Sequence, residues 1–137
     1  MTTAADLART HAACFSHTRA WSEAEFSALL SASTTWLIGD ATSFALLRGV
    51  ADEAEILTLA THPDSHRQGR ARAVLTEVDT KLRPSIAQVF LEVDETNQAA
   101  CALYSACGYH NIGRRKNYYT HADGRRSDAL ILGKNLT

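Results

Sequence analysis

The sequence predicts a mixed α/β fold in which a central mixed β-sheet is flanked by helices. Short apolar, β-branched runs alternate along the chain with segments whose apolar residues recur at helical spacing. Their order is two helices, two strands, two successive strand–helix units and two closing strands. A strand that continues through a helix can pair in parallel with the next strand, whereas directly connected strands pair antiparallel. The sheet should therefore contain both kinds of pairing.

Length and composition fit one domain over residues 1–137. The chain can bury one hydrophobic core, and its 45% hydrophobic and 21% charged residues are typical of soluble globular proteins. A formal charge of −1 gives no general attraction to nucleic acid or to a membrane. The sequence shows no signal peptide and no membrane-spanning run, and its three cysteines lack metal-type clustering. We therefore expect a cytoplasmic protein with free thiols.

Two helices are predicted at the start of the chain. Residues 4–15 carry apolar side chains at helical spacing. The second helix has a capping box, because Ser22 is followed three residues later by Glu25. Trp21, just before the cap, is placed to pack against Phe26 of the first turns.

Strands are predicted over residues 36–38 and 44–50, with a turn at residues 39–40 between them. The next run, residues 56–61, is almost continuously apolar and β-branched. Such a run is typical of a strand that is buried on both faces. Pro63 ends it.

The second half of the chain alternates helix and strand. A helix is predicted from Gly69 to about residue 83, before Pro84. A strand over residues 89–93 follows, and then a helix over residues 97–106. Gly108 is predicted to end this helix in the left-handed conformation.

Two closing strands are predicted over residues 109–113 and 128–132, with a polar, aromatic connection over residues 114–126. The connection begins with the hexapeptide Arg-Arg-Lys-Asn-Tyr-Tyr at residues 114–119. Its basic and aromatic residues fit recognition of nucleic acid, of a peptide or of an acidic group. A solvated hairpin connection fits the same residues.

The loop over residues 66–72 joins the 56–61 strand to the following helix. Unpaired backbone N–H groups and the positive end of the helix dipole favour an anion at a helix start. Gly69 lets the backbone approach a ligand, and three arginines add positive charge. The loop is therefore a candidate cradle for a diphosphate, although an ordinary strand–helix turn fits equally well.

Three polar residues are candidates for chemistry. Glu92 lies in an apolar strand, where burial would make its carboxylate a better proton acceptor, unless a neighbouring group or solvent satisfies it. Tyr104 shares a helix face with core residues, and Asn97 starts the same helix, so packing and N-capping explain both residues by themselves. His62 and His66 lack the further ligands that a metal site needs.

Over nearly its whole length the sequence resembles the GCN5-related N-acetyltransferase (GNAT) family. Residues 66–71 resemble the family's Q/R-x-x-G-x-G/A signature, with His66 in the first position. Leu91-Glu92-Val93 together with the 114–119 hexapeptide resembles the RimI type, whose members acetylate the N-terminal alanine of a small-subunit ribosomal protein. The other matching stretches are Trp21-Ser22-Glu23, Ile56-Leu57-Thr58-Leu59-Ala60, His62-Pro63, Asn97, Ala100, Leu103-Tyr104 and Gly108-Tyr109.

The resemblance implies a GNAT fold whose first edge strand is missing. Two parallel strands, around Leu59 and Val93, would splay apart and admit the pantetheine arm of acetyl-CoA. Glu92 is implied as the proton acceptor and Tyr104 as the proton donor. The implied cofactor-binding residues are Leu59, Ala60, Thr61, Arg67, Gln68, Gly69, Arg70, Ala71, Arg72 and Asn97. Arg70 replaces an aliphatic residue of the family, which implies extra charge toward the phosphates.

The activity implied by the resemblance is transfer of an acetyl group from acetyl-CoA to the N-terminal amine of a protein, without a metal. The implied substrate is the N-terminal alanine of a small-subunit ribosomal protein, with no nucleic acid or membrane as direct partner. Tyr118 and Tyr119 are hypothesised to form a wall of the peptide site. Acetylation of another protein N-terminus or of a small-molecule amine is the first alternative. A non-catalytic acyl-CoA-binding module is the second, although Glu92 and Tyr104 together favour an enzyme.

Overall fold

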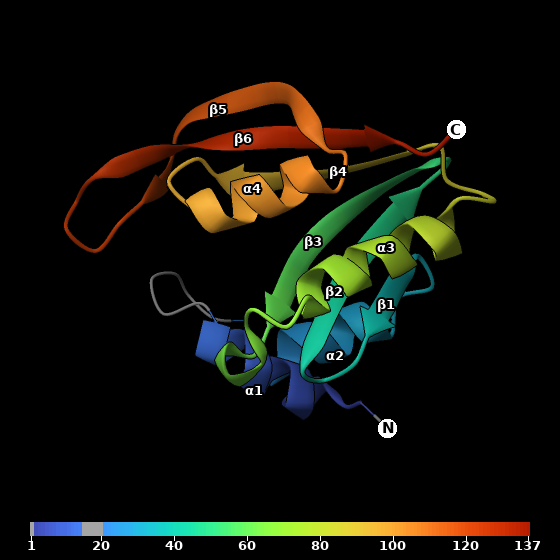
Figure 1. Cartoon of the computed structure of the whole chain (residues 1–137). Coiled ribbons are helices and arrows are strands. Elements are labelled where there is room, and N and C mark those ends of the chain that lie inside the picture. The colour runs from blue at the N-terminus through green and yellow to red at the C-terminus, as the bar shows by residue number, and fades with distance from the viewer. Residues whose placement is uncertain (1, 15–20) are drawn as a thin grey trace.

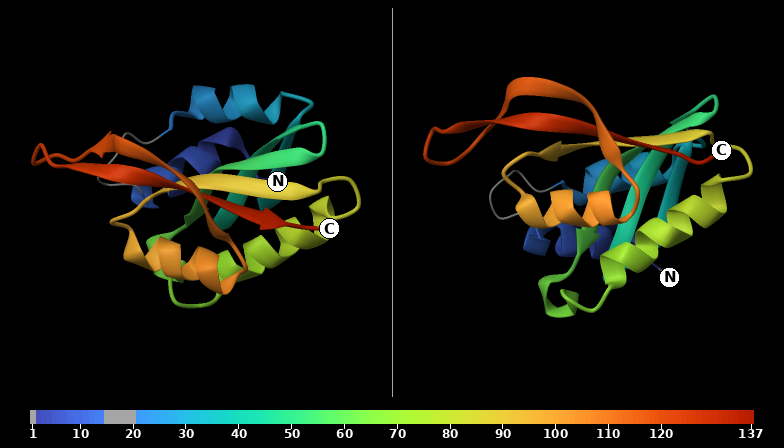
Figure 2. Two further views of the ribbon diagram at one scale, coloured as in Figure 1. Left: turned by 90° about the horizontal axis from the view of Figure 1, so that it is seen from above. Right: turned by 45° about the horizontal axis from the view of Figure 1, so that its top comes forward.

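The computed structural model describes residues 2–14 and 21–137. One six-stranded sheet lies between two groups of helices (Figures 1 and 2). The first predicted helix included Phe15, which lies outside the described residues. The helices are α1 (Ala4–Cys14), α2 (Glu23–Leu30), α3 (Arg70–Leu82) and α4 (Gln98–Ala106), with a 3₁₀ turn η1 (Pro63–Ser65). The strands are β1 (Thr35–Gly39), β2 (Ser43–Val50), β3 (Glu53–Thr61), β4 (Gln88–Asp94), β5 (His110–Thr120) and β6 (Arg126–Asn135).

The sheet is mixed, as predicted, with the strand order β1-β2-β3-β4-β6-β5. β3 and β4 run parallel, because α3 returns the chain to the edge at which β3 began; the other neighbouring strands are antiparallel. The parallel pairing covers only Glu53–Ile56 against Gln88–Leu91. β3 nevertheless continues to Thr61, and β4 to Asp94. The two strands therefore diverge over their second halves (Figure 1).

β3 carries a bulge where this divergence begins. Leu46 of β2 pairs with Thr58. The next residue, Leu47, pairs with Ile56, which leaves Leu57 without a partner in β2. A bulge bends its strand and increases the local twist. The bulge therefore helps to direct the end of β3 away from β4.

The sheet separates two hydrophobic cores. Side chains of β2 alternate between them, with Phe44 and Leu46 in the core beneath α1 and α2. Ala45 and Leu47 belong to the other core, which α3 and α4 cover. The core on the α3 and α4 side also takes Val89, Leu91 and Val93 of β4, so it joins β4 to β2 and β3.

β3 and β4 are each buried on one face and only half-buried on the other. Along β4, Val89, Leu91 and Val93 are buried, whereas the residues between them stay partly accessible. β3 alternates in the same way over residues 54–61. The prediction of a strand buried on both faces at residues 56–61 was therefore wrong, because the divergence of the strands opens one face.

The predicted helix ends are confirmed. Ser22 Oγ accepts a hydrogen bond from the amide of Glu25, and Glu25 Oε1 accepts one from the amide of Ser22. Trp21 and Phe26 pack with ring centroids 5.5 Å apart, which fixes the direction in which the chain enters α2. Gly108 ends α4 at φ +94°, as predicted.

The closing strands are longer than predicted. Residues 114–120, expected as a loop connection, belong to β5, and the β5–β6 hairpin projects past the start of α4 (Figure 2). β5 presents exposed side chains along nearly its whole length, so hydrophobic alternation could not indicate a strand there. Its pairing with β6 also slips twice, between Asn111 and Gly113 and between Arg115 and Tyr119.

Cys14, Cys101 and Cys107 are free thiols. The helices of the described residues all fall short of the length and apolar character that crossing a bilayer requires. Residues 2–14 and 21–137 contain no group of three or more His, Cys, Asp and Glu side chains that could hold a metal ion.

Candidate active site

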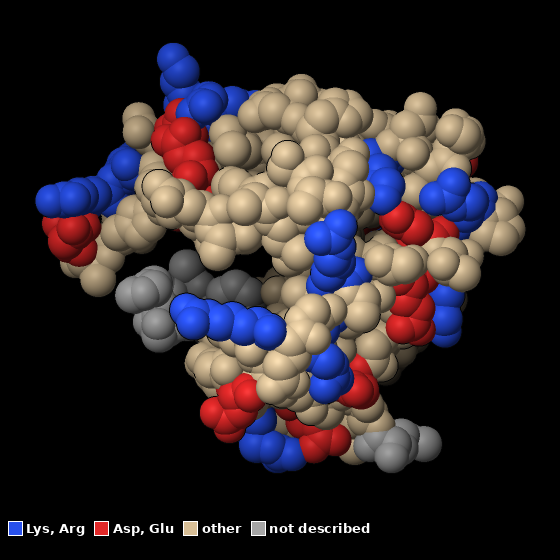
Figure 3. Space-filling model, in the orientation of Figure 1, with Lys and Arg blue, Asp and Glu red and all other residues tan. Residues whose placement is uncertain are grey.

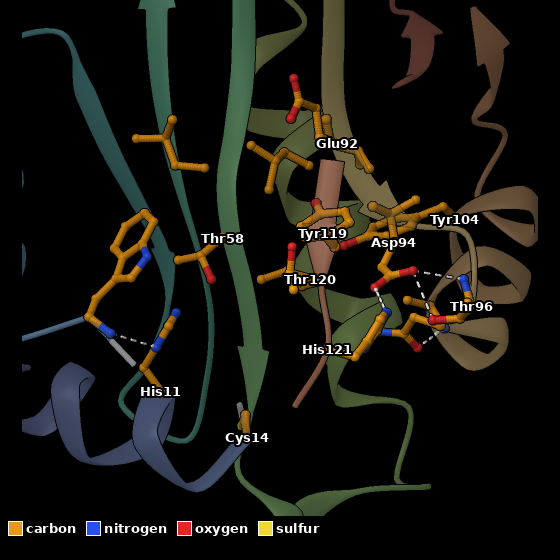
Figure 4. A pocket seen from close by; sticks show the side chains of 18 residues that line it. His11, Cys14, Thr58, Glu92, Asp94, Thr96, Tyr104, Tyr119, Thr120 and His121 are labelled. Atoms are coloured by element: carbon orange, nitrogen blue, oxygen red, sulfur yellow. Dashed lines mark hydrogen bonds and ion pairs between the residues drawn. The ribbon is translucent and has the colours of Figure 1, made fainter. Parts of the chain in front are cut away.

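A cleft of about 690 Å³ lies where β3 and β4 diverge (Figure 4). One wall is the second half of β3, and the other is formed by β4, α4 and the end of β5. Residues of α1 lie across its far side. In the space-filling view the molecule is hollowed between its upper part, which contains β5 and β6, and its lower part (Figure 3).

The edge of β3 that faces the cleft has no strand partner beyond Ile56. Leu59, one of the three positions expected to contact the cofactor with its backbone, lines the cleft. Ala60 is buried in the core beneath α1 and α2. The carbonyl of Thr61 accepts a hydrogen bond from Cys14 Sγ and lies 2.8 Å from His66 Nε2. The His66 side chain, which departs from the family signature, therefore closes the loop onto the end of β3.

The 66–72 loop has the conformation of an anion cradle. Arg67 and Gly69 both adopt left-handed backbone conformations, at φ +64° and +73°. The backbone N–H groups of residues 67–72 find no acceptor among the residues that the structure describes. A Cβ added at Gly69 would meet no atom within 4 Å, so the loop is open around this glycine. Free donors and open space at a helix start fit a diphosphate.

The Arg70 side chain does not extend the cradle. Its guanidinium donates to both carboxylate oxygens of Asp40 in the β1–β2 turn, at 3.0 and 2.9 Å. Burial opposes ionisation of Asp40, but two backbone amides and Arg70 outweigh it and lower the pKa of the carboxyl. The expectation of extra charge toward the phosphates was therefore wrong for Arg70, whose charge is committed to this pair.

Glu92 lines the cleft and is only partly buried, with 22% of its side chain exposed. Arg115 of β5 lies against it, with Nε 3.1 Å from Glu92 Oε1. The neighbouring group that the sequence left open as an alternative thus exists. The Arg115 guanidinium also lies over the ring of Tyr118, 5.4 Å from its centroid. Glu92 is therefore held in place on the β4 wall of the cleft.

Tyr104 projects from α4 toward the same cleft (Figure 4). Burial raises the pKa of its hydroxyl well above the usual value. The hydroxyl therefore stays protonated and can donate a proton. Tyr104 also packs edge-to-face on Tyr109 at 5.7 Å, so its predicted core role is real as well.

Asn97 borders the cleft while its side chain caps α4, since Oδ1 accepts the amide hydrogen of Ala100.

Tyr119 lines the cleft, and burial, with Glu92 nearby, raises the pKa of its hydroxyl to about 12. Tyr118 packs against Tyr119 but is half exposed and lies outside the cleft lining. The two tyrosines that the sequence grouped together thus occupy different surfaces.

The basic hexapeptide is largely neutralised by carboxylates. Arg114 Nη1 lies 2.6 Å from carboxylate oxygens of both Glu95 and Asp128. Arg115 is paired with Glu92. These pairs leave little free positive charge for nucleic acid along this face.

One cluster in the cleft was missed by the sequence interpretation. Asp94, Thr96 and His121 line the cleft, and Ser127 joins them. Asp94 and Thr96 form a local turn that a sequence pattern can suggest. His121 and Ser127 reach them only through the β5–β6 hairpin, about 30 residues later, and no spacing rule indicates that contact.

Residues 3–109 match the sequence model of the Acetyltransferase (GNAT) family, and the chain belongs to this family. It is 40% identical over 95 residues to the [Ribosomal protein bS18]-alanine N-acetyltransferase of Escherichia coli (strain K12), which covers 69% of this chain and 64% of that protein. It is 37% identical over 95 residues to the protein of the same name from Haemophilus ducreyi, covering 69% and 66%. The matched region thus spans less than two thirds of these relatives' length. The resemblance to the GNAT family is confirmed.

Solved structures agree on the fold. The crystal structure of the ribosomal-protein-S18-alanine N-acetyltransferase from Escherichia coli superposes with a TM-score of 0.88 at 31% identity, covering 98% of this chain and 88% of that one. A GNAT family acetyltransferase from Elizabethkingia anophelis with acetyl-CoA bound superposes with a TM-score of 0.67 at 15% identity, covering 80% of each chain. This second likeness concerns the fold alone.

Proposed function

We propose that this chain is an acetyl-CoA-dependent N-acetyltransferase that acts on the N-terminal amine of a protein. The observation that carries the proposal is a cleft between diverging parallel strands, with the carboxylate of Glu92 and the hydroxyl of Tyr104 on one wall. Family membership and the curated names of the relatives support it. Those names favour the N-terminal alanine of a ribosomal protein as the substrate, which would place the enzyme in the cytoplasm.

The coenzyme end of the site would be held mainly by backbone. The free N–H groups of residues 67–72 fit the diphosphate, and the unpaired edge of β3 near Leu59 fits the amides of the pantetheine arm. Because amide donors are already in position, they need no reorganisation when the coenzyme binds. Acetyl-CoA supplies the activated acetyl group, and the backbone groups of the chain bind the coenzyme and orient that group.

The chemistry would take place between β4 and α4. An α-amine has a pKa of about 7.7–8.0, so part of it is neutral at neutral pH. Glu92 accepts a proton as the amine attacks the thioester carbonyl, and Tyr104 donates one to the departing thiolate. General acid–base assistance of this kind typically contributes ~10²–10⁴-fold. Holding the amine against the thioester contributes the larger remaining share.

The experiment that tests this function compares peptides that differ only in their first residue, each incubated with acetyl-CoA. Peptides starting with Ala should be acetylated at the α-amine, and the same peptides with a blocked N-terminus should not react. Turnover of small amines alone would assign the chain to the small-molecule alternative. Tight coenzyme binding without transfer to any amine would leave only a binding module and would refute the proposal.

A further inference from the structure

The cluster at the mouth of the cleft is built around Asp94. Its Oδ1 accepts hydrogen bonds from the Thr96 amide at 2.9 Å, the Thr96 hydroxyl at 2.8 Å and the Ser127 hydroxyl at 2.7 Å. Its Oδ2 lies 3.3 Å from His121 Nε2. Burial opposes ionisation of Asp94, but these hydrogen bonds and His121 outweigh it and lower the pKa of the carboxyl. Asp94 is therefore a fixed negative charge beside the imidazole (Figure 4).

The cluster also fixes the tautomer of His121. His121 Nε2 lies 2.8 Å from Ser127 Oγ, and the single hydroxyl hydrogen of Ser127 is donated to Asp94. Ser127 must therefore accept from His121, so Nε2 carries the hydrogen. The neutral ring then bears its basic lone pair on Nδ1, for which the described residues provide no hydrogen-bond partner.

His121 stands between two hollows. It lines the main cleft together with Glu92 and Tyr119. It also lines a second hollow of about 450 Å³ at the end of the β5–β6 hairpin, whose lining is Thr96 and residues 121–123 and 125–127. Its backbone is held by the turn, because its amide donates to the carbonyl of Arg125 at 2.8 Å. With 32% of its side chain exposed, His121 is accessible from solvent.

Starting from the bound ammonium, the proposed reaction moves two protons off the nitrogen. A peptide ammonium carries three hydrogens and the amide product keeps one, so two protons leave the nitrogen. When the N–C bond forms and the C–S bond breaks, the departing CoA thiolate takes up one proton, which offsets one of the two lost by the nitrogen. The other must reach solvent. Glu92, which lines the cleft and is paired with Arg115, is the proposed acceptor of one of the two.

Resting on the proposed function, we propose that His121 is a proton-relay residue that carries the second proton out of the cleft. Nδ1 takes the proton that the bound ammonium loses before attack, through water in the cleft, and then releases it to solvent, to which the side chain is accessible. Asp94 and Ser127 are positioning residues that orient the ring. The relay lets the protonated amine, which predominates at pH 7, react after it has bound. Without it, only amine that is already neutral in solution is productive.

The test measures kcat/KM for an Ala-starting peptide in the wild type and in His121→Ala and His121→Gln, with His110→Ala on the exposed start of β5 as the matched control. At pH 7 both His121 variants should lose about six- to elevenfold, which is the reciprocal of the neutral fraction of an amine of pKa 7.7–8.0. Gln retains a donor for Ser127 but cannot take a proton, so it separates the loss of the base from the loss of a hydrogen bond. The control should match the wild type.

Two readouts distinguish a relay from a structural role. The defect should shrink as the pH rises above about 8, where the amine is neutral before it binds. Added imidazole should restore kcat/KM of His121→Ala at pH 7 and leave the wild type unchanged. If the wild type transfers acetyl groups and His121→Gln matches it at pH 7, or if the defect is independent of pH and of imidazole, the relay is refuted. A wild type without transfer activity would instead refute the proposed function.

Discussion

Glu92 shows how far single residues can be interpreted from a sequence. A carboxylate in an apolar strand was recognisable as unusual, and the structure places it in the cleft. Its partner Arg115 was not predictable, because the contact depends on the register of β5 and β6 beside β4. The candidate base was thus found from sequence, but its electrostatic setting was not.

Replacing Glu92 with Gln should lower kcat by about 10²–10⁴-fold, the usual contribution of a general base. Gln has nearly the same shape, so binding of acetyl-CoA at the other end of the cleft should be unaffected. Steady-state kinetics together with calorimetric titration of the coenzyme check both statements. An unchanged kcat would remove Glu92 from the mechanism.

Tyr118 and Tyr119 form a matched pair of probes, since only Tyr119 lines the cleft. Tyr119→Ala should raise the KM for the peptide by several-fold, because it removes a wall of the cleft. Tyr118→Ala should leave the peptide KM nearly unchanged, although it removes the ring beneath Arg115. Equal effects of the two substitutions on the peptide KM would contradict the hypothesis that Tyr119 forms a wall of the peptide site.

At the scale of elements, local signals predicted most of the fold. The capping box of α2, the glycine at the end of α4 and the apolar runs of β2, β3 and β4 all act over a few residues, and all are confirmed. β5 was only partly predicted, because its long exposed strand is stabilised by pairing with β6 rather than by burial. The Arg70–Asp40 pair was missed for a similar reason, since it joins residues 30 positions apart.

The start of α3 allows a controlled test of the cradle. Gly69 and Gly124 both have positive φ, at +73° and +85°, and neither has an atom within 4 Å of an added Cβ. Substitution by Ala should cost each site a similar ~1–2 kcal/mol of backbone strain. Only Gly69→Ala should also raise the KM for acetyl-CoA, because strain at this position would shift the backbone of the loop whose free amides are proposed to bind the diphosphate.

Thermal unfolding and coenzyme kinetics of the two variants check this prediction. A matched loss of stability with a selective rise in KM for Gly69→Ala supports the cradle. If Gly124→Ala weakens coenzyme use as much as Gly69→Ala does, the effect belongs to general destabilisation rather than to the loop.

At the scale of the whole molecule, the cleft results from the way the sheet is held. Two cores pack on opposite faces of β2 and β3, whereas β4 pairs with β6 and contributes side chains to the core beneath α3 and α4 only. The bulge at Leu57 and the short parallel pairing then separate the two halves at one end. Residues on β3, β4, α4 and β5 face one another across that opening because of the topology, which no local pattern encodes. The family resemblance supplied this divergence in advance, and the strand pairing confirms it.

A crystal structure of the chain in complex with coenzyme A tests this account most directly. We expect the diphosphate within hydrogen-bonding distance of the backbone N–H groups of residues 67–72, and the pantetheine arm between β3 and β4 with its thiol directed toward Tyr104. Coenzyme bound elsewhere, or a cleft closed by its own side chains with the amides of residues 67–72 facing only solvent, would contradict it.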